Sequence, residues 1–506
     1  MLKKILIANR GEIAVRVIRA CREMGIESVA VYSEVDRNSL HVQEADEAVL
    51  IGEAPAAESY LNIERIMQAV RDTGAQAVHP GYGFLAENAM FSRRCEEAGI
   101  VFIGPDSKAM ELVGDKIRSR QIMQKAGIPI IPGMKNAESS PATFARKAEA
   151  IGYPVMIKAS AGGGGKGMRI VRDPDSLNSA LEAGRREARS AFGDDSVYLE
   201  KYIEEPRHVE FQILADHYGN IVHVFERECS IQRRHQKIIE ESPSPALDPE
   251  LRSTMGATAI QVMRTAGYTN AGTVEFLLDK NKRFYFLEVN ARLQVEHPVT
   301  ELVSGLDLVH EQIRIASGEK LRFSQEMLQS RGHALECRIY AEDPDKQFLP
   351  YPGKILYLKS PQGPGIRHDA GIYSGWEVPI HYDPILAKLI VWAEDREAAC
   401  RRMEAALGEY VVLGVKTCIG FLRDVMRHPQ FRSGCLSTDF LVKYFDGWKS
   451  SGSEEGQEMT LAALAAVLES GTRLQKSGSG LSPSQEVHSP WIRLGKWEMG
   501  GGGSGL

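Results

Sequence analysis

The sequence predicts a multidomain protein that combines α/β and α+β architecture. Three observations support this prediction. Over residues 1–114, short apolar runs alternate with segments of helical periodicity, which is typical of βαβ units around a parallel sheet. From 115 to 330 the pattern changes to β-hairpins, one of which has a glycine-rich tip. From 331 to 445, strand-like runs such as 354–358 and 387–392 predict a third, sheet-rich domain.

The N-terminal region is expected to form a parallel sheet because its strands and helices alternate. Gly25 ends the first helix, and a glycine-rich turn follows the third strand at 80–83. That turn either borders a ligand crevice at the strand ends or is only a tight connection. The expected elements are, in order, a strand at 4–8, a helix at 13–24, a strand at 28–32, a strand at 77–79, a helix at 87–98 and a strand at 100–103.

A glycine-rich loop at 160–167 joins two expected strands, 155–158 and 168–171. Four consecutive glycines would let backbone N–H groups approach a ligand closely. The loop is not a Walker A motif, because Gly167 stands where Ser or Thr would bind Mg²⁺ and a strand follows. A flexible hairpin tip would explain the glycines equally well, but Lys158 at the strand end favours a phosphate site.

A second hairpin places two glutamates opposite each other. If Asn281 and Lys282 form a two-residue turn, Glu275 pairs with Glu288 across the ladder, and Asn290 projects from the same face. Two carboxylates and an amide oxygen are a hard oxygen set that suits Mg²⁺. The alternative is a pair of glutamates on a solvated sheet face. The strands are expected at 273–278 and 284–289.

Charged and apolar residues alternate in further segments around this hairpin. A basic cluster runs from Glu226 to Lys237, upstream of it. Beyond the hairpin, the alternation continues through Arg292, Gln294 and Glu296. The segment at 208–213, which contains His208, Glu210 and Gln212, is expected to be a half-buried strand, in which a lone histidine is more often structural than catalytic.

Composition excludes several classes of protein. The net charge of −6 and the pI near 6.2 argue against a nucleic-acid coat. The seven cysteines form no CxxC pair, which fits a reducing compartment and no structural zinc. No apolar run approaches the length of a membrane span, and the first apolar run is too short for a signal peptide. We therefore expect a cytoplasmic protein without a membrane partner.

The glycine loop with Lys158, the segment 200–203, the cluster at 226–237 and the run from Glu288 to Glu296 resemble the biotin carboxylase branch of the ATP-grasp enzymes. The resemblance covers about residues 1–445, and the last two motifs are specific to that branch. Ala161 and Lys166 depart from the family pattern, where glycine and arginine are usual, but both keep the needed chemistry. The domains that the resemblance implies are an N-terminal domain at 1–114, an ATP-grasp domain at 115–330 with a lid at about 131–205, a C-terminal domain at 331–445, and a linker-like tail at 446–506 with possible partner-docking strands.

The resemblance also implies roles for individual residues. Glu296 would be the general base for bicarbonate, and Arg338 would bind the ureido oxygen of biotin. Bicarbonate would be bound by Lys237, Arg292, Gln294 and Val295, and Mg²⁺ or Mn²⁺ by Glu275, Glu288 and Asn290. The residues expected around ATP, besides the two metal-binding glutamates, are Lys116, Lys158, Gly164, Gly165, Glu200, Lys201, Ile203, His208, Gln232 and His235.

The implied reaction carboxylates biotin with ATP and bicarbonate through carboxyphosphate, and gives ADP, phosphate and N1-carboxybiotin. It is the first half-reaction of a biotin-dependent acyl-CoA or keto-acid carboxylase. No Ala-Met-Lys-Met signature occurs, so we expect a separate biotin carboxyl carrier protein, separate carboxyltransferase subunits and, by resemblance, a homodimer. Two alternatives remain: another ATP-grasp ligase acting on a free small molecule, and a non-catalytic ATP-binding scaffold subunit.

Overall fold

The structure is a computed structural model that describes residues 2–134, 140–159, 168–192 and 194–450. The chain divides into two compact units, Met1–Lys449 and Ser450–Leu506. Nearly all of the second unit, and with it most of the expected tail, lies outside the described residues.

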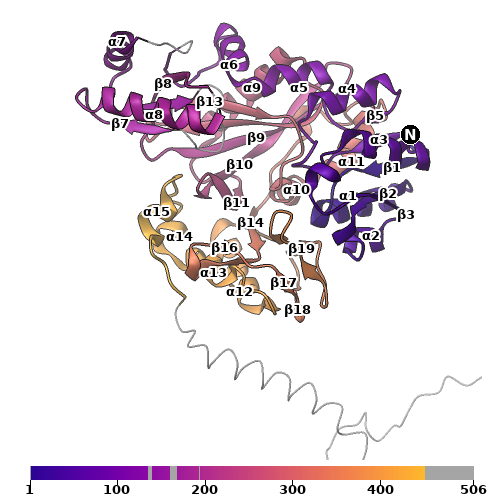
Figure 1. The fold of residues 1–506 in the computed structure, drawn as a ribbon. Helices are drawn as coiled ribbons and strands as arrows, with labels where there is room; N and C mark the ends of the chain where they lie inside the picture. The colour runs from indigo at the N-terminus through magenta and orange to yellow at the C-terminus, as the bar shows by residue number, and fades with distance from the viewer. Residues whose placement is uncertain (1, 135–139, 160–167, 193, 451–506) are drawn as a thin grey trace, which may run out of the picture. The chain divides into compact units, whose positions relative to one another are not determined.

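The N-terminal region forms the expected parallel sheet, with strand order β3-β2-β1-β4-β5 (Figure 1). Apolar side chains on both faces of the central strand are buried, because helices cover the sheet on each side. The strands are β1 (Lys4–Ile7), β2 (Glu27–Ser33), β3 (Glu47–Gly52), β4 (Ala77–His79) and β5 (Val101–Phe102); the helices are α1 (Gly11–Glu23), α2 (Leu40–Glu44), α3 (Ile63–Thr73), α4 (Ala89–Glu97) and α5 (Ser107–Gly114).

A small antiparallel sheet with its own apolar core follows helix α6 (Lys116–Lys125). Two helices pack against it, and their apolar residues share its core. The expected pairing of the two strands that flank the glycine loop is confirmed, since Val155 pairs with Val171. The loop itself, 160–167, lies outside the described residues. The elements are α7 (Pro141–Ile151), β6 (Val155–Ala159), β7 (Arg169–Val171), α8 (Leu177–Phe192) and β8 (Val197–Lys201).

An eight-stranded sheet joins the middle region to the C-terminal region, in the order β13-β12-β9-β10-β11-β14-β21-β19. The junction is the antiparallel pairing of β11 with β14, in which Glu240 lies opposite Glu336. The sequence predicted two separate domains here and did not indicate a shared sheet. The strands are β9 (Arg207–Ala215), β10 (Ile221–Arg233), β11 (Gln236–Ser242), β12 (Asn270–Leu278), β13 (Phe284–Asn290), β14 (His333–Tyr340), β19 (Ile366–Ala370) and β21 (Ile385–Ala393).

Helices and short strand pairs complete both regions. Helix α9 (Pro249–Ala266) packs on β9 and β10, and α10 (His297–Ser304) and α11 (Leu308–Ala316) follow the end of β13. In the C-terminal region, the expected strand at 354–358 is split into β17 (Gly353–Lys354) and β18 (Tyr357–Lys359), which pair with different partners. The remaining elements are β15 (Glu342–Asp343), β16 (Leu349–Pro350), β20 (Glu377–Val378), α12 (Arg396–Glu409), β22 (Val411–Leu413), α13 (Ile419–Arg427), α14 (Pro429–Arg432) and α15 (Phe440–Phe445).

The hairpin of β12 and β13 confirms the predicted pairing of Glu275 with Glu288. The predicted turn is wrong. Leu278 pairs with Phe284, so the loop has five residues, and a register irregularity after Glu275 restores the predicted pairing. The Asp279 carboxylate accepts hydrogen bonds from the backbone N–H groups at 281 and 283. This local hydrogen bonding favours the longer loop over a two-residue turn.

Strand β9 is buried on both faces, so the prediction of a half-buried strand is wrong. Its apolar residues Val209, Phe211 and Ile213 face a hydrophobic core. Its polar residues His208, Glu210 and Gln212 face other polar side chains and are equally buried. Strand alternation correctly separated the two faces but could not show that the polar face is covered.

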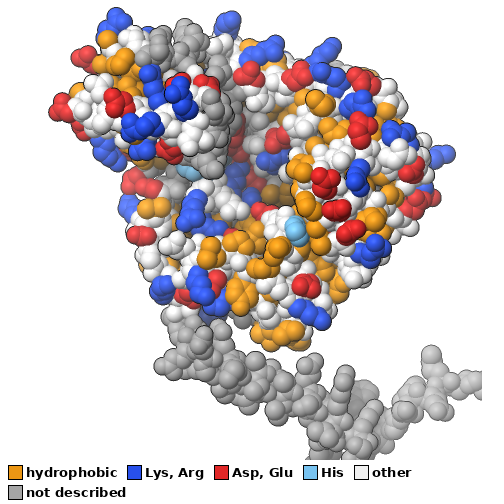
Figure 2. Space-filling model, in the orientation of Figure 1, with side chains coloured by type: hydrophobic (Ala, Val, Ile, Leu, Met, Phe, Trp, Pro, Cys, Tyr) orange, Lys and Arg blue, Asp and Glu red, His pale blue; other side chains and the backbone are white. Residues whose placement is uncertain are grey.

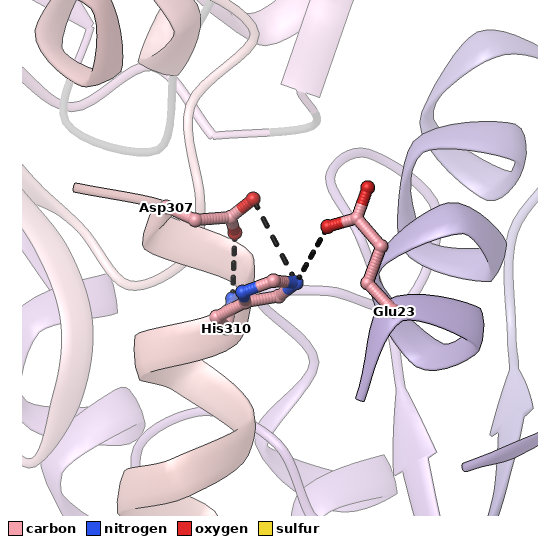
Figure 3. A group of neighbouring side chains, drawn as sticks. All are labelled: Glu23, Asp307 and His310. Carbon is pink, nitrogen blue, oxygen red and sulfur yellow. Dashed lines mark hydrogen bonds and ion pairs between the residues drawn. The ribbon is translucent and has the colours of Figure 1, made fainter. Parts of the chain in front are cut away.

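A set of ion pairs links α1 to α11 (Figure 3). The Nε2 atom of His310 lies 3.2 Å from a carboxylate oxygen of Glu23 and 3.8 Å from one of Asp307. Asp307 also caps α11, by accepting a hydrogen bond from the His310 N–H, and it pairs with Arg16 at 2.7 Å. One oxygen of Asp307 therefore caps α11, and the other joins α11 to α1 through Arg16.

Candidate active site

Three buried carboxylates surround the ammonium group of Lys237. The Lys237 Nζ atom lies 2.8 Å from Glu275 and 2.7 Å from Glu296, and it also donates to Glu210. These residues come from different elements: Lys237 from β11, Glu210 from β9, Glu275 from β12, and Glu296 from the segment before α10. Figure 2 shows a hollow in the middle of the view in which Lys, Arg, Asp and Glu side chains gather. We call Lys237 and its three partners the Lys237 cluster.

Arg227 supports the cluster and is fully buried. Its guanidinium donates to Glu210 at 2.6 Å and to Gln212 at 2.8 Å, and it also reaches the hydroxyl groups of Thr273 and Thr300. Arg227 and Glu210 lie directly opposite each other on β10 and β9. The sequence analysis assigned neither residue a role in the site. The alternation of polar and apolar residues in each strand was visible in the sequence. The pairing of the two strands, which brings Arg227 and Glu210 together, was not.

The charges of the cluster shift the pKa of its members. Burial alone would lower the pKa of Lys237, but the carboxylates of Glu210, Glu275 and Glu296 raise it well above its usual value. Burial would raise the pKa of Glu296, but Lys237 and then Arg338 hold it well below its usual range. The ammonium group and the Glu296 carboxylate are therefore both ionised at neutral pH.

Arg338 on β14 lies beside the cluster. Its Nε atom donates to Glu240 at 2.6 Å, and its terminal nitrogen donates to Glu296 at 2.9 Å. Burial raises the pKa of Glu240 to about 7, although Arg338 opposes the rise. Because the β11 and β14 strands are hydrogen-bonded neighbours, the shared sheet places Arg338 and Glu240 within reach of each other. Glu240 is a further site residue that the sequence analysis did not single out.

The segment that follows β13 is organised by Arg292. Its guanidinium donates to Gln294 at 2.9 Å, to Asn290 at 3.1 Å and to Glu87 at 3.0 Å. Gln294 in turn reaches Glu275 at 3.4 Å. Arg292, Asn290 and Gln294 are thus connected to the Lys237 cluster, although β13 ends at Asn290 and the predicted strand alternation does not continue to Glu296. Glu87 lies in the N-terminal region, in the turn that precedes α4.

The expected metal ligands lie at one edge of the cluster. Glu275 and Glu288 are a directly opposed pair, and Asn290 follows Glu288 by two residues on the same strand. Glu275 also contacts His208 at 3.1 Å; burial would raise the pKa of Glu275, but Lys237 and then His208 lower it well below its usual value. Two carboxylates and an amide oxygen on neighbouring strands fit a hard divalent cation.

The residues expected around the nucleotide are more dispersed. Lys158 lies 2.6 Å from Glu200, across neighbouring strands of the small sheet. The side chain of Lys201 donates to the carbonyl groups of Gly152 and Tyr153, both at 2.9 Å, so it holds a loop of this sheet. Ile203 is buried two residues after the end of β8, and His208 contacts Gln232 at 2.8 Å.

Four nucleotide candidates are not placed by contacts. His235 is exposed at the turn between β10 and β11. Gly164, Gly165 and the side chain of Lys116 lie outside the described residues, although Lys116 begins α6.

Among the helices that the structure describes, none is long and apolar enough to cross a bilayer.

Comparison with known protein families accounts for most of the chain. The family described as "Biotin carboxylase, N-terminal domain" matches residues 1–110, and "Biotin carboxylase C-terminal domain" matches 336–443. Between them, "Carbamoyl-phosphate synthase L chain, ATP binding domain" matches 115–324.

Individual relatives agree with these matches. The chain is 56% identical over 447 residues to a pyruvate carboxylase subunit of Methanothermobacter thermautotrophicus, covering 88% of this chain and 91% of that protein. It is 55% identical over 438 residues to the biotin carboxylase of Nostoc sp., covering 87% and 98%. Among solved structures, the biotin carboxylase domain dimer of Hydrogenobacter thermophilus 2-oxoglutarate carboxylase, in complex with MgADP, ADP and bicarbonate, superposes with a TM-score of 0.84 at 49% identity, covering 89% of this chain and 100% of that one. The chain therefore belongs to the biotin carboxylase family of ATP-grasp ligases.

Proposed function

We propose that this chain carboxylates biotin on a separate carrier protein, using ATP and bicarbonate and releasing ADP and phosphate. The observation that supports this most directly is the position of Glu296, which contacts Lys237 on one side and Arg338 on the other. The two cations on either side of this buried carboxylate are suited to bind a small anion as well. The anion would then lie next to Glu296. The relative from Nostoc sp. is named a biotin carboxylase, and the solved structure is a biotin carboxylase domain in complex with MgADP, ADP and bicarbonate.

The cations address a specific electrostatic difficulty. Bicarbonate is an anion that must attack the terminal phosphate of ATP, which is also anionic. Lys237 and Arg292 would hold bicarbonate, together with Gln294 and the backbone at Val295, and would offset the repulsion as the phosphoryl group is transferred. Both side chains are ionised and largely buried, so their charges are screened less than at an open surface.

Glu296 would act as the general base, and its protonation would follow from the arrival of substrate. Burial would raise the pKa of Glu296, but Lys237 and Arg338 hold it low, which makes the carboxylate a weak base. When bicarbonate competes for the same cations, each cation stabilises the Glu296 carboxylate less, so its pKa rises. The base would thus become effective when its substrate is bound.

Glu275, Glu288 and Asn290 would hold Mg²⁺ or Mn²⁺. When bound, the metal ion neutralises charge on the phosphate groups of ATP. The nucleotide would be contacted by residues of the small sheet, of the large sheet and of the glycine loop: Lys116, Lys158, Gly164, Gly165, Glu200, Lys201, Ile203, His208, Gln232 and His235.

The second half of the reaction would take place at Arg338. Carboxyphosphate would break down to CO2 and phosphate beside biotin, the phosphate would take the proton from the ureido N1 atom, and N1 would attack CO2 to form the N–C bond of carboxybiotin. The planar guanidinium of Arg338 would stabilise the negative oxygen that develops on the ureido ring. We further propose that the chain forms a homodimer and supplies carboxybiotin, on its carrier, to a carboxyltransferase subunit.

The proposed role of Glu296 is tested by the substitution Glu296→Gln. We expect ATP turnover by the wild-type protein to depend on both bicarbonate and free biotin, when ADP release is measured. The variant should lose this turnover by about 10²–10⁴-fold, because general-base catalysis contributes that much, while calorimetric MgADP binding stays within about twofold.

A matched control is Glu228→Gln, which makes the same change at a buried glutamate outside the cluster. Glu228 accepts hydrogen bonds from Ser230 and Ser244, and no substrate role is assigned to it. Its substitution should leave the dependence on bicarbonate and biotin intact. Wild-type turnover that needs neither bicarbonate nor biotin would refute the proposed function.

A further inference from the structure

Lys388 is a fully buried lysine on β21, outside the Lys237 cluster. Its ammonium group donates to the backbone carbonyl of Val295 at 2.9 Å and lies 3.3 Å from the Glu12 carboxylate. The ring of Tyr82 lies 5.7 Å from the same nitrogen. A lysine that is completely removed from water is rare and is kept only where its charge is compensated.

Lys388 and its two partners come from three regions of the chain. Glu12 is in the first turn of α1 in the N-terminal region, Val295 lies between β13 and α10, and Lys388 belongs to the C-terminal region. The backbone is tightly packed here: a Cβ atom added to Gly371 would lie 2.6 Å from the backbone nitrogen of Glu12. The ammonium group is therefore held in place by rigid elements on both sides.

The hydrogen bond to Val295 fixes the peptide that leads into Glu296. A trans peptide is planar, so the direction of the Val295 carbonyl sets the plane of the Val295–Glu296 peptide and hence the starting point of the Glu296 side chain. Bonds from an ammonium group to a carbonyl are charge-assisted and stronger than neutral ones. The Glu12 carboxylate makes no hydrogen bond among the described residues, so the carbonyl is the better-oriented partner of the lysine.

We propose that Lys388 is a positioning residue for bicarbonate activation: by holding the Val295 carbonyl, it sets the orientation of Glu296 and of the backbone expected to contact bicarbonate. This inference rests on the function proposed above. It concerns a residue that would touch neither substrate nor metal and that acts only through the segment 292–296.

The test compares Lys388→Met with Lys388→Arg. We expect Lys388→Met to raise the KM for bicarbonate at least tenfold and to lower kcat, with the KM for ATP changed less than twofold. Lys388→Arg keeps a donor for the carbonyl and should recover at least part of the loss. A merely structural residue would not separate the KM for bicarbonate from that for ATP.

Two further variants keep the test decisive. Lys388→Met leaves Glu12 without its counter-charge, so the double variant Lys388→Met/Glu12→Gln removes both buried charges and should fold even where the single variant does not. Leu389→Ala is the stability control: its buried side chain is in the C-terminal apolar core, and it should lower the melting temperature without changing the KM for bicarbonate.

The outcomes separate the two proposals. Wild-type protein without bicarbonate- and biotin-dependent turnover would count against the proposed function itself. Active wild type, with a double variant whose bicarbonate KM is unchanged, would overturn the role of Lys388. So would a Leu389→Ala variant that raises the bicarbonate KM as much as the Lys388 variants do, because the effect would then be general destabilisation.

Discussion

Lys237 and Lys388 are both lysines inside the same compact unit, yet their surroundings differ. The Lys237 side chain is 12% exposed and contacts three carboxylates, whereas Lys388 is 0% exposed and has one carboxylate and one carbonyl as partners. Three carboxylates surround the Lys237 ammonium group, but Arg227 also pairs with Glu210 and Arg338 with Glu296, so these buried charges share partners. Burial raises the pKa of Glu210, with Lys237 opposing the rise and Glu296 adding to it.

The difference indicates what each lysine does. Several cations and carboxylates that share partners and have access to solvent are suited to exchange partners with an incoming anion. A lysine without access to solvent, held by one carboxylate and one carbonyl, is suited to hold the backbone in one position. Shared partners combined with partial exposure therefore distinguish the proposed reaction site from its proposed support.

The strongest effect is expected for Lys237→Met, because this substitution removes the ammonium group that three carboxylates share. We expect bicarbonate-dependent turnover to fall by about 10²–10³-fold and the protein to lose about 3–5 kcal/mol of stability. ADP release and thermal unfolding measure the two effects. The matched control is Lys282→Met, at a lysine that is 59% exposed and pairs with Asp248, where both quantities should stay close to wild type. Turnover retained in Lys237→Met would contradict the assigned role.

A second prediction concerns the pH dependence of stability that arises from Glu12, the carboxylate partner of Lys388. Burial raises the pKa of Glu12 from 4.5 to about 7, although Lys388 opposes the rise. A carboxyl group whose pKa is higher in the folded state stabilises the protein below pH 4.5, and this contribution is lost as the pH rises towards 7. Relative to Glu12→Gln, the wild-type protein should therefore lose up to about 3 kcal/mol of stability over that range.

Thermal unfolding of both proteins from pH 2 to pH 8 measures this difference. Glu241 provides a control of opposite sign, because Arg396 and His333 lower its pKa to about 2 against the effect of burial. Its contribution is present above pH 4.5 and is lost on acidification towards pH 2. A wild-type minus Glu12→Gln difference that does not depend on pH would show that Glu12 keeps an ordinary pKa.

The smallest effect is expected at the ion pairs between α1 and α11. The Glu23 side chain is 64% exposed, so its pairing with His310 is screened by solvent. Glu23→Gln should change stability by less than about 1 kcal/mol. Asp307→Asn should cost more, because Asp307 also caps α11 and pairs with Arg16. Equal effects of the two variants on the melting temperature would contradict this ranking.

The sequence predicted most of what depends on local pattern. The parallel sheet, the glycine-loop hairpin and the opposed pair of Glu275 and Glu288 follow from periodicity and spacing, and the structure confirms them. The turn of the second hairpin did not follow, because the hydrogen bonds of Asp279 and a register irregularity depend on atomic detail that spacing does not encode.

Long-range pairing accounts for what the sequence missed. Glu210 and Arg227 meet only because β9 pairs with β10 in one register, and Glu240 meets Arg338 only because β11 pairs with β14. Lys388 lies within an apolar strand. The sequence does not indicate that its ammonium group donates to the carbonyl of Val295, 93 residues away. Such contacts are decided by the tertiary arrangement of strands rather than by any segment alone.

The unbroken run of strands from β13 to β19 has a practical consequence for anyone who wishes to dissect this protein. Cutting the polypeptide near residue 330 would separate β11 from β14 and Arg338 from Glu296. It would also expose two unpaired strand edges, which tend to aggregate with other molecules. The middle and C-terminal thirds can thus be transplanted, fused or expressed only as a single piece.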